Sequence, residues 1–262
     1  MSENILEINN LSKYFGGLAA VSDCSLNVKR GTITGIIGPN GSGKTTLFNL
    51  IAGNLKSSSG NVTFDQENIT DVPSYELFSK GLLRTFQIAH EFSNLSVLEN
   101  LMMVPGNQSG EKLMTALLKP KLVAEEEVTV KEKAKEVVDF LNLGHLSNEL
   151  AGNLSGGQKK LLELGRTMMV DAKLVLLDEV GAGVNRTLLK DLGTAIEKLN
   201  KEKGYTFCMI EHDMDFIGRL CDPVIVMAEG SVLFEGSVED AKKDEKVIES
   251  YLGRGSKLKG AN

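Results

Sequence analysis

A short glycine-rich segment with a single lysine carries the clearest chemical signal in the sequence. Residues 38–46 read GPNGSGKTT, which matches the spacing GxxxxGK[ST], and an apolar run typical of a strand, residues 35–37, comes directly before them. Glycines let successive backbone N–H groups turn toward an anion, and a helix that begins near Lys44 adds the positive end of its dipole. The segment therefore predicts a loop that binds the phosphates of a nucleotide.

The side chains of this loop have separate expected roles. We expect Lys44 to reach the β- and γ-phosphates, Thr45 to supply a hydroxyl to Mg²⁺, and Thr46 to place a further hydroxyl close to the phosphates. The predicted contacts to the nucleotide in this segment are Gly38, Asn40, Gly41, Ser42, Gly43, Lys44, Thr45 and Thr46.

Two carboxylates end a second apolar run. Residues 174–177 read LVLL and are followed by Asp178 and Glu179, as expected of a buried parallel strand whose carboxyl end opens onto a ligand crevice. We expect Asp178 to hold Mg²⁺ through its water shell, and Glu179, which points elsewhere, to polarise an attacking water. Strands that end in acids are common, so this prediction depends on the phosphate-binding loop.

A third motif, LSGGQ at residues 154–158, predicts a second anion-binding element. Ser155 can cap a helix whose open N–H groups face an anion, and two glycines permit a close approach. A bare Ser-Gly-Gly is usually an ordinary helix cap, but the full pentapeptide stands shortly before the Asp-Glu strand. The predicted contacts are Ser155, Gly156, Gly157 and Gln158.

The elements that position these motifs are mainly strands in the first part of the chain, helices in the middle, and alternating strands and helices in the last part. Strands are expected at residues 5–8, 24–28, 32–37 and 61–64, with a helix at 44–52. From about residue 88 to 153, helical patterns such as 97–103 and 128–143 replace strand signals. Strands at 174–177, 206–210 and 224–227 then alternate with helices at 186–201 and 213–220, which predicts parallel strands with crossover helices. A hairpin strand at 231–235 and a helix at 244–251 are expected to follow.

Composition excludes several classes of protein. The chain has 262 residues and a net charge of −6 without a basic stripe, which disfavours a general affinity for nucleic acid. No apolar run approaches the length of a membrane span and the amino terminus lacks a signal core, so we expect a cytoplasmic location. The three cysteines lack metal-ligand spacing, and we expect reduced, buried thiols.

The three motifs, in this order across nearly the whole chain, resemble those of the ATP-binding cassette (ABC) ATPases: a Walker A loop, the LSGGQ signature and a Walker B strand. The resemblance implies an α/β fold, with a P-loop NTPase (RecA-like) core around a parallel sheet, an N-terminal antiparallel β subdomain and an inserted α-helical subdomain. Residues 1–87 and 154–253 are expected to form the core, 88–153 the helical subdomain, and 254–262 a loose tail. In this family two cassettes pair head to tail, so each ATP with its Mg²⁺ lies between the Walker A loop of one chain and the LSGGQ of the other.

The resemblance also implies roles for three further positions. Gln87, in RTFQ at residues 84–87, matches the Q-loop glutamine that contacts Mg²⁺ or the attacking water. His212 matches the switch histidine that reaches the γ-phosphate. Phe15 matches the aromatic side chain that stacks on adenine, with Tyr14 as the alternative.

Two positions depart from the family pattern. Val180 stands where a proline usually follows the Walker B glutamate, and Asn185 stands where the D-loop often has an aspartate. Because Glu179 is intact, the hydrolytic group is retained. Asn185 removes a charge that would face the partner cassette.

Within the family, the sequence is similar to the Liv-type cassettes that drive uptake of branched-chain amino acids, urea or short amides. The similarity is carried by RTFQ, by NLSVLEN at residues 94–100 and by the ending VIESYLG at residues 247–253. It implies as partners a second cassette, identical or different, membrane permease subunits, a substrate-binding protein without direct contact, and no nucleic acid. It also implies a peripheral position on the cytoplasmic face of the membrane. The alternatives are a soluble ABC ATPase of DNA repair or translation, which the single cassette and short insertion disfavour, and a cassette of another transporter, such as a lipid or lipopolysaccharide exporter.

Overall fold

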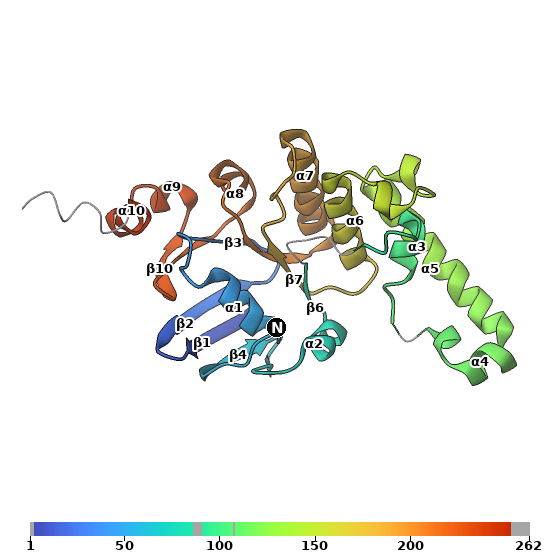
Figure 1. Ribbon diagram of the computed structural model, residues 1–262, viewed down its shortest axis with the longest axis horizontal. Coiled ribbons are helices and arrows are strands. Elements are labelled where there is room, and N and C mark those ends of the chain that lie inside the picture. Colours follow the sequence, from blue (N-terminus) through green and yellow to red (C-terminus); the bar gives the residue numbers. More distant parts are fainter. Residues whose placement is uncertain (1–2, 86–90, 107, 253–262) are drawn as a thin grey trace, which may run out of the picture. The chain divides into compact units, whose positions relative to one another are not determined.

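A computed structural model describes residues 3–85, 91–106 and 108–252 of the chain (Figure 1). Gln87 lies outside the described residues. The described chain divides into two compact units. The sheet unit contains residues 3–84, 173–181 and 197–252, and the helical unit contains residues 85, 91–106, 108–172 and 182–196.

A six-stranded sheet with the order β10-β9-β3-β8-β7-β6 forms the centre of the sheet unit. Its strands are β3 (Ile33–Ile37), β6 (Leu82–Arg84), β7 (Leu174–Asp178), β8 (Thr206–Ile210), β9 (Val224–Ala228) and β10 (Ser231–Gly236). Neighbouring strands are parallel except β10, which runs antiparallel to β9. Every residue of β3, β7 and β8 is buried, as expected for apolar strands covered on both faces. The predicted parallel sheet is therefore confirmed.

A second, antiparallel sheet has the order β2-β1-β4-β5, and its strands lie before and after β3 in the sequence. Its strands are β1 (Asn4–Phe15), β2 (Leu18–Lys29), β4 (Ser59–Phe64) and β5 (Glu67–Asn68). The first two strands are much longer than predicted. Register shifts between Ile8 and Leu11 and between Leu11 and Lys13 break the alternation of side chains, which is why the pattern indicated only short strands.

Helix α1 (Lys44–Ile51) packs into an apolar core of the sheet unit. Leu47, Phe48 and Ile51 join buried side chains from both sheets, among them Leu6 of β1 and Leu176 of β7. The remaining helices of this unit are α2 (Ser74–Lys80), α8 (Met214–Leu220), α9 (Val238–Ala241) and α10 (Glu245–Leu252). This core anchors α1 and the carboxyl ends of the strands, which carry the candidate site.

The helical unit is built from α3 (Val97–Met102), α4 (Leu113–Leu118), α5 (Pro120–Phe140), α6 (Gly156–Met168) and the first part of α7 (Arg186–Lys203). Short 3₁₀ turns lie at Ser109–Glu111 (η1), Gly144–Leu146 (η2) and Ala151–Asn153 (η3). The helical unit extends beyond the predicted segment 88–153, because α6 packs against α3 and α5 and residues 182–196 join it. Helix α5 starts earlier than the predicted residue 128, at Pro120, a favourable first helical residue.

No helix in the described part of the chain combines the length and apolar content that a membrane span requires. Cys24, Cys208 and Cys221 are buried and free, as predicted. Burial raises the pKa of Cys24 to about 11 and that of Cys208 to about 12, which makes both thiols unreactive.

Candidate nucleotide-binding site

The glycine-rich loop connects β3 to α1 in a backbone conformation that only glycine permits at two points. Gly43, the N-cap of α1, has φ 99°, and an added Cβ would lie 2.4 Å from the carbonyl oxygen of Ala20. Gly38 has φ 148°, and its Cβ would lie 2.1 Å from the carbonyl oxygen of Met227. No side chain caps α1 and its first turn holds no acid. The N-terminal amides of this helix are thus available to an anion.

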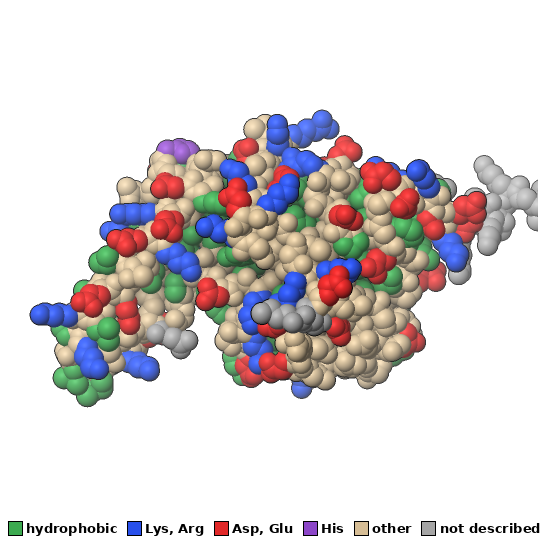
Figure 2. Space-filling view, turned by 180° about the vertical axis from the view of Figure 1, so that it is seen from behind, with side chains coloured by type: hydrophobic (Ala, Val, Ile, Leu, Met, Phe, Trp, Pro, Cys, Tyr) green, Lys and Arg blue, Asp and Glu red, His purple; other side chains and the backbone are tan. Residues whose placement is uncertain are grey.

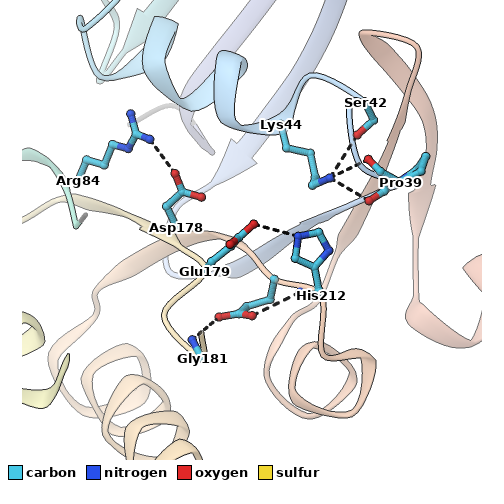
Figure 3. A network of polar contacts seen from close by, with 10 residues as sticks. Pro39, Ser42, Lys44, Arg84, Asp178, Glu179, Gly181 and His212 are labelled. Carbon is cyan, nitrogen blue, oxygen red and sulfur yellow. Dashed lines mark hydrogen bonds and ion pairs between the residues drawn. The ribbon is translucent and has the colours of Figure 1, made fainter. Parts of the chain in front are cut away.

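Lys44, the first residue of α1, is 6% exposed and folds back over the loop (Figure 3). Its Nζ donates to the carbonyl oxygens of Gly38 at 2.8 Å and Pro39 at 3.0 Å, and to Ser42 Oγ at 3.4 Å. Burial lowers the pKa of Lys44, and the negative charges of Glu179 and Asp178 oppose that shift. A buried cation held by carbonyl oxygens lies where phosphate oxygens would offer it stronger partners.

A pocket of about 410 Å³ surrounds the start of α1 within the sheet unit. Every predicted loop contact except Gly38 lines the pocket. The other lining residues come from the β1–β2 hairpin and from the segments that follow β7 and β8. The lining residues are Phe15, Leu18, Ala19, Ala20, Asn40, Gly41, Ser42, Gly43, Lys44, Thr45, Thr46, Glu179 and His212. Phe15 lines the pocket whereas Tyr14 does not, although both side chains are about half exposed.

Asp178 ends β7 and is buried beside a guanidinium group. Arg84, at the end of the neighbouring strand β6, donates through Nη2 to Asp178 Oδ2 at 2.7 Å and through Nη1 to Asn49 Oδ1 at 2.7 Å. The arginine thus joins β7 to α1. Because both Arg84 and Asp178 are largely buried, the pair compensates two charges that would be costly alone.

Glu179 points away from Asp178 and toward His212 (Figure 3). Its Oε1 lies 2.9 Å from His212 Nε2, and its backbone has φ 49°, an uncommon conformation for glutamate that often marks functional sites. The two residues follow the carboxyl ends of the adjacent parallel strands β7 and β8, at the same edge of the sheet. The structure therefore brings together three residues predicted from separate motifs: Lys44, Glu179 and His212.

Glu211 connects the segment after Glu179 with the segment that contains His212. Its carboxylate accepts hydrogen bonds from the backbone N–H of Gly181 at 2.7 Å and of His212 at 3.3 Å. Burial raises the pKa of Glu211, and these two hydrogen bonds oppose the shift.

The donor set fits Mg²⁺ held together with phosphate. In the described residues, no group of three or more His, Cys, Asp or Glu side chains is arranged to hold a metal ion. Proteins commonly bind Mg²⁺ through one or two carboxylates together with substrate phosphates. The hydroxyl of Thr45 lines the pocket, and the negative charge of Asp178 opposes the lowering of the pKa of Lys44 by burial. One hydroxyl and one carboxylate beside the phosphate-binding loop are the kind of ligands that such a metal site would use.

The LSGGQ motif lies in the helical unit and forms the start of α6. Ser155 Oγ accepts from the N–H of Gln158 at 3.4 Å, and Gln158 Oε1 accepts from the N–H of Ser155 at 2.9 Å, which completes a capping box. Ser155 and Gly156 are exposed, while Gly157 is buried. A Cβ on Gly157 would lie 2.5 Å from Leu188 Cδ1, so packing against α7 accounts for this glycine.

Asn185 has a local role at the start of α7. Its Oδ1 accepts from the N–H of Leu188 at 3.0 Å, as a helix N-cap does. An aspartate would make the same bond, so this departure from the family pattern preserves the local structure. Val180, the other departure, is buried.

Arg84 and Glu211 were not assigned a role from the sequence. Arg84 stood in the RTFQ motif, but its partner Asp178 is distant in sequence and strand β6 is only three residues long. Glu211 directly follows the apolar strand β8, and an acid at a buried parallel strand end is the signal that drew attention to Asp178 and Glu179.

Comparisons with known proteins agree with this geometry. A family model described as ABC transporter matches residues 21–182. The chain is 43% identical to the probable branched-chain amino acid transport ATP-binding protein LivG of Archaeoglobus fulgidus, over 95% of each chain. It is 35% identical to the high-affinity branched-chain amino acid transport ATP-binding protein BraF of Pseudomonas aeruginosa, over 97% of this chain and 99% of that protein.

Solved structures lead to the same conclusion. A nucleotide-free ATP-binding cassette from an ABC transporter is 39% identical and superposes with a TM-score of 0.82, over 96% of this chain and 100% of that chain. Another ATP-binding cassette, solved in its ADP conformation, is 39% identical with a TM-score of 0.81, over 97% of this chain and 100% of that chain. The predicted fold is confirmed, and the chain belongs to the ABC transporter family as an ATP-hydrolysing cassette.

Proposed function

We propose that this chain binds Mg·ATP and hydrolyses it to drive uptake of branched-chain amino acids or a related small polar solute through a membrane permease. The observation that carries the proposal is the convergence of Lys44, Glu179 and His212 on one pocket beside α1. The transported solutes follow the names of the relatives from Archaeoglobus fulgidus and Pseudomonas aeruginosa. These relatives also disfavour a soluble repair or translation ATPase and a lipid exporter.

Each side chain has a distinct task in this proposal. Lys44 exchanges its loop carbonyl partners for phosphate oxygens, and Phe15 rather than Tyr14 stacks on adenine because it lines the pocket. Glu179 accepts a proton from the attacking water, and His212, hydrogen-bonded to it, supports the γ-phosphate. Thr45 through its hydroxyl, and Asp178 through water, would hold Mg²⁺, which would supply positive charge to the phosphates. Gln87 keeps its proposed role beside the metal or the water.

A second cassette completes the site in our proposal. The amides at the start of α6, with the exposed Ser155 and Gly156, contact the γ-phosphate of a nucleotide bound to the other cassette's glycine-rich loop. A solved ABC transporter cassette that is 25% identical to this chain, with a TM-score of 0.71 over 89% of this chain and 98% of that chain, is described as dimeric.

Coupling to the permease is assigned to the loop before α3 in the helical unit. The buried Asn100 Nδ2 donates to the carbonyl oxygens of Phe92 at 3.0 Å and Leu95 at 3.2 Å, which fixes the loop. The Phe92 ring remains about half exposed with the Arg166 guanidinium 5.6 Å from its centroid. We expect this loop to receive a short permease helix at the cytoplasmic face of the membrane. Cross-links from permease loops should form at Phe92→Cys; cross-links confined to α10 would refute the assignment.

The variant Glu179→Gln tests the function. Because a positioned base contributes roughly 10²–10⁴-fold to rate, we expect ATP turnover to fall by at least about 100-fold while ATP affinity stays within about twofold. Cells that carry the variant should lose uptake of labelled leucine, isoleucine and valine. The matched control is Glu249→Gln, at an exposed carboxylate on α10, and it should leave both readouts unchanged. Full turnover in Glu179→Gln would exclude Glu179 as the base, and intact uptake of all three amino acids would exclude the assigned solutes.

A further inference from the structure

Helix α4 (Leu113–Leu118) displays its large apolar side chains outward. Leu113, Met114, Leu117 and Leu118 are 76%, 67%, 69% and 71% exposed. Thr115 and Ala116, the smaller residues between them, are only partly exposed. A surface helix normally buries its large apolar side chains and exposes its polar ones. Helix α4 does the opposite, so its large apolar side chains contribute little to the packing of the helical unit.

The segment is nevertheless held firmly against α5. Ser109 of η1 donates to Glu126 of α5 through its backbone N–H at 2.8 Å and through its hydroxyl at 2.7 Å. Gln108 Nε2 donates to the carbonyl oxygens of Met102 at 3.3 Å and Pro105 at 2.9 Å. Contacts of α4 with η1 and α5 complete the support. The apolar side chains are therefore presented by a built structure and not by a loose excursion of the chain.

Lysines frame this apolar surface. Lys112 and Lys119 flank α4, and Lys121 follows at the start of α5; all three are exposed. Residues 111–122 hold these three lysines and one glutamate, Glu111, a net charge of +2 in a chain whose net charge is −6. Figure 2 shows hydrophobic side chains with basic side chains, and some acidic ones, around them at the end of the helical unit where Figure 1 places α4. The acidic run 125–127 begins about one turn later on α5, so the net positive charge belongs to residues 111–122 and not to the rest of α5.

We propose that the surface formed by Leu113, Met114, Leu117, Leu118 and the three lysines, the α4 tip, inserts into the headgroup region of an anionic lipid bilayer. A short apolar surface framed by lysines is the pattern of interfacial membrane-binding helices, because lysine stems lie along apolar tails while their ammonium groups reach lipid phosphates. The composition disfavours a protein partner. Protein interfaces are depleted of lysine and draw their binding energy mainly from Trp, Tyr and Arg, none of which is present in the α4 tip.

This contact goes beyond the proposed transport function. The α4 tip would bring the chain to the membrane surface by its own affinity for lipid, before or beside any contact with a permease. The interaction requires neither nucleotide nor permease, so it is tested apart from ATP hydrolysis and uptake.

The test is co-sedimentation of the purified full-length chain with vesicles of phosphatidylcholine alone, or with about 30% phosphatidylglycerol, without nucleotide or permease. We expect the wild type to bind the anionic vesicles at least about tenfold more tightly than the neutral ones, since each lysine near an anionic surface contributes several-fold. Leu113→Gln/Leu117→Gln should weaken binding to the anionic vesicles at least about tenfold. Lys119→Gln/Lys121→Gln should remove most of the preference for anionic vesicles, and its binding should lose most of its sensitivity to salt.

Matched controls separate this surface from general effects. Lys131→Gln/Lys135→Gln removes the same charge from exposed positions further along α5, and Leu150→Gln removes an exposed leucine elsewhere in the helical unit. Both should change vesicle binding less than about twofold. Circular dichroism and ATP affinity equal to wild type establish that each variant is folded.

Any of four outcomes would overturn the proposal. The wild type does not sediment with anionic vesicles; Leu113→Gln/Leu117→Gln binds them as tightly as wild type; or binding appears only when the vesicles contain permease, which would make the permease the occupant. Self-association of the wild type that Leu113→Gln/Leu117→Gln abolishes, without vesicle binding, would assign the surface to a second copy and would also refute it.

Discussion

Helices α1 and α6 both begin at glycine-rich segments, yet their first turns are satisfied in opposite ways. The N-cap of α1 is a glycine at φ 99° without a side-chain cap, and Lys44 at its first position is buried over the loop. The N-cap of α6 is Ser155, whose capping box with Gln158 is complete. The start of α1 lines a pocket with Glu179 and His212, whereas Ser155 and Gly156 are exposed.

In the proposed function, these two helix starts would hold one anion as unequal contributors. At α1 the loop supplies open amides and a cation beside Glu179 and His212, so this end can bind a phosphate within one chain. At α6 the helix start is capped by its own side chains and is exposed, so we propose that it contacts a nucleotide bound by another chain. On this proposal the first end supplies most of the binding affinity, and the second recognises a nucleotide that is already bound.

The largest expected difference between the two helix starts is the loss of ATP affinity when a lysine is removed from each. Lys44→Ala deletes a buried ammonium group that we expect to bind the β- and γ-phosphates, and ATP affinity of the isolated chain should fall by about 100-fold, the loss of two charge-assisted hydrogen bonds. The matched control is Lys159→Ala on α6, which removes a lysine paired with Glu91 at 2.7 Å. Calorimetric titration with ATP should give Lys159→Ala an affinity within about twofold of wild type. Equal losses of ATP affinity in the two variants would show that the starts of α1 and α6 do not differ in phosphate binding.

Exchanging the N-cap residues should invert the usual ranking of caps. Serine is normally a better N-cap than glycine, but Gly43→Ser forces a Cβ to within 2.4 Å of the Ala20 carbonyl oxygen in a left-handed backbone, and unfolding in urea should show a loss of about 2 kcal/mol or more. Ser155→Gly keeps an acceptable N-cap and should cost only a few tenths of a kcal/mol. A stable Gly43→Ser would show that the loop conformation is not constrained by its packing.

The sequence predicted the elements with strong apolar patterns and did not predict the contacts between distant ones. The strands at Leu174 and Thr206 were correct to within a residue because each is a run of buried residues ended by polar ones. Strand β6 was missed because three residues carry no periodicity, and with it the pairing of Arg84 with Asp178. Phe15 and Tyr14 could not be separated, because only the course of the β1–β2 hairpin decides which ring lines the pocket.

The central claim is that the open end of α1 in one chain is completed by the capped end of α6 in a second cassette, which we test with a second copy of this chain. Lys44→Ala disables the first contributor, and Ser155→Arg places a long side chain over the second at an exposed position. Each variant alone should have almost no ATPase activity. In an equal mixture, about half of the dimers pair the two variants and carry one intact site of two, so activity should return to about a quarter of wild type. Activity no greater than that of the separate variants would contradict the claim that a second copy of this chain completes the site.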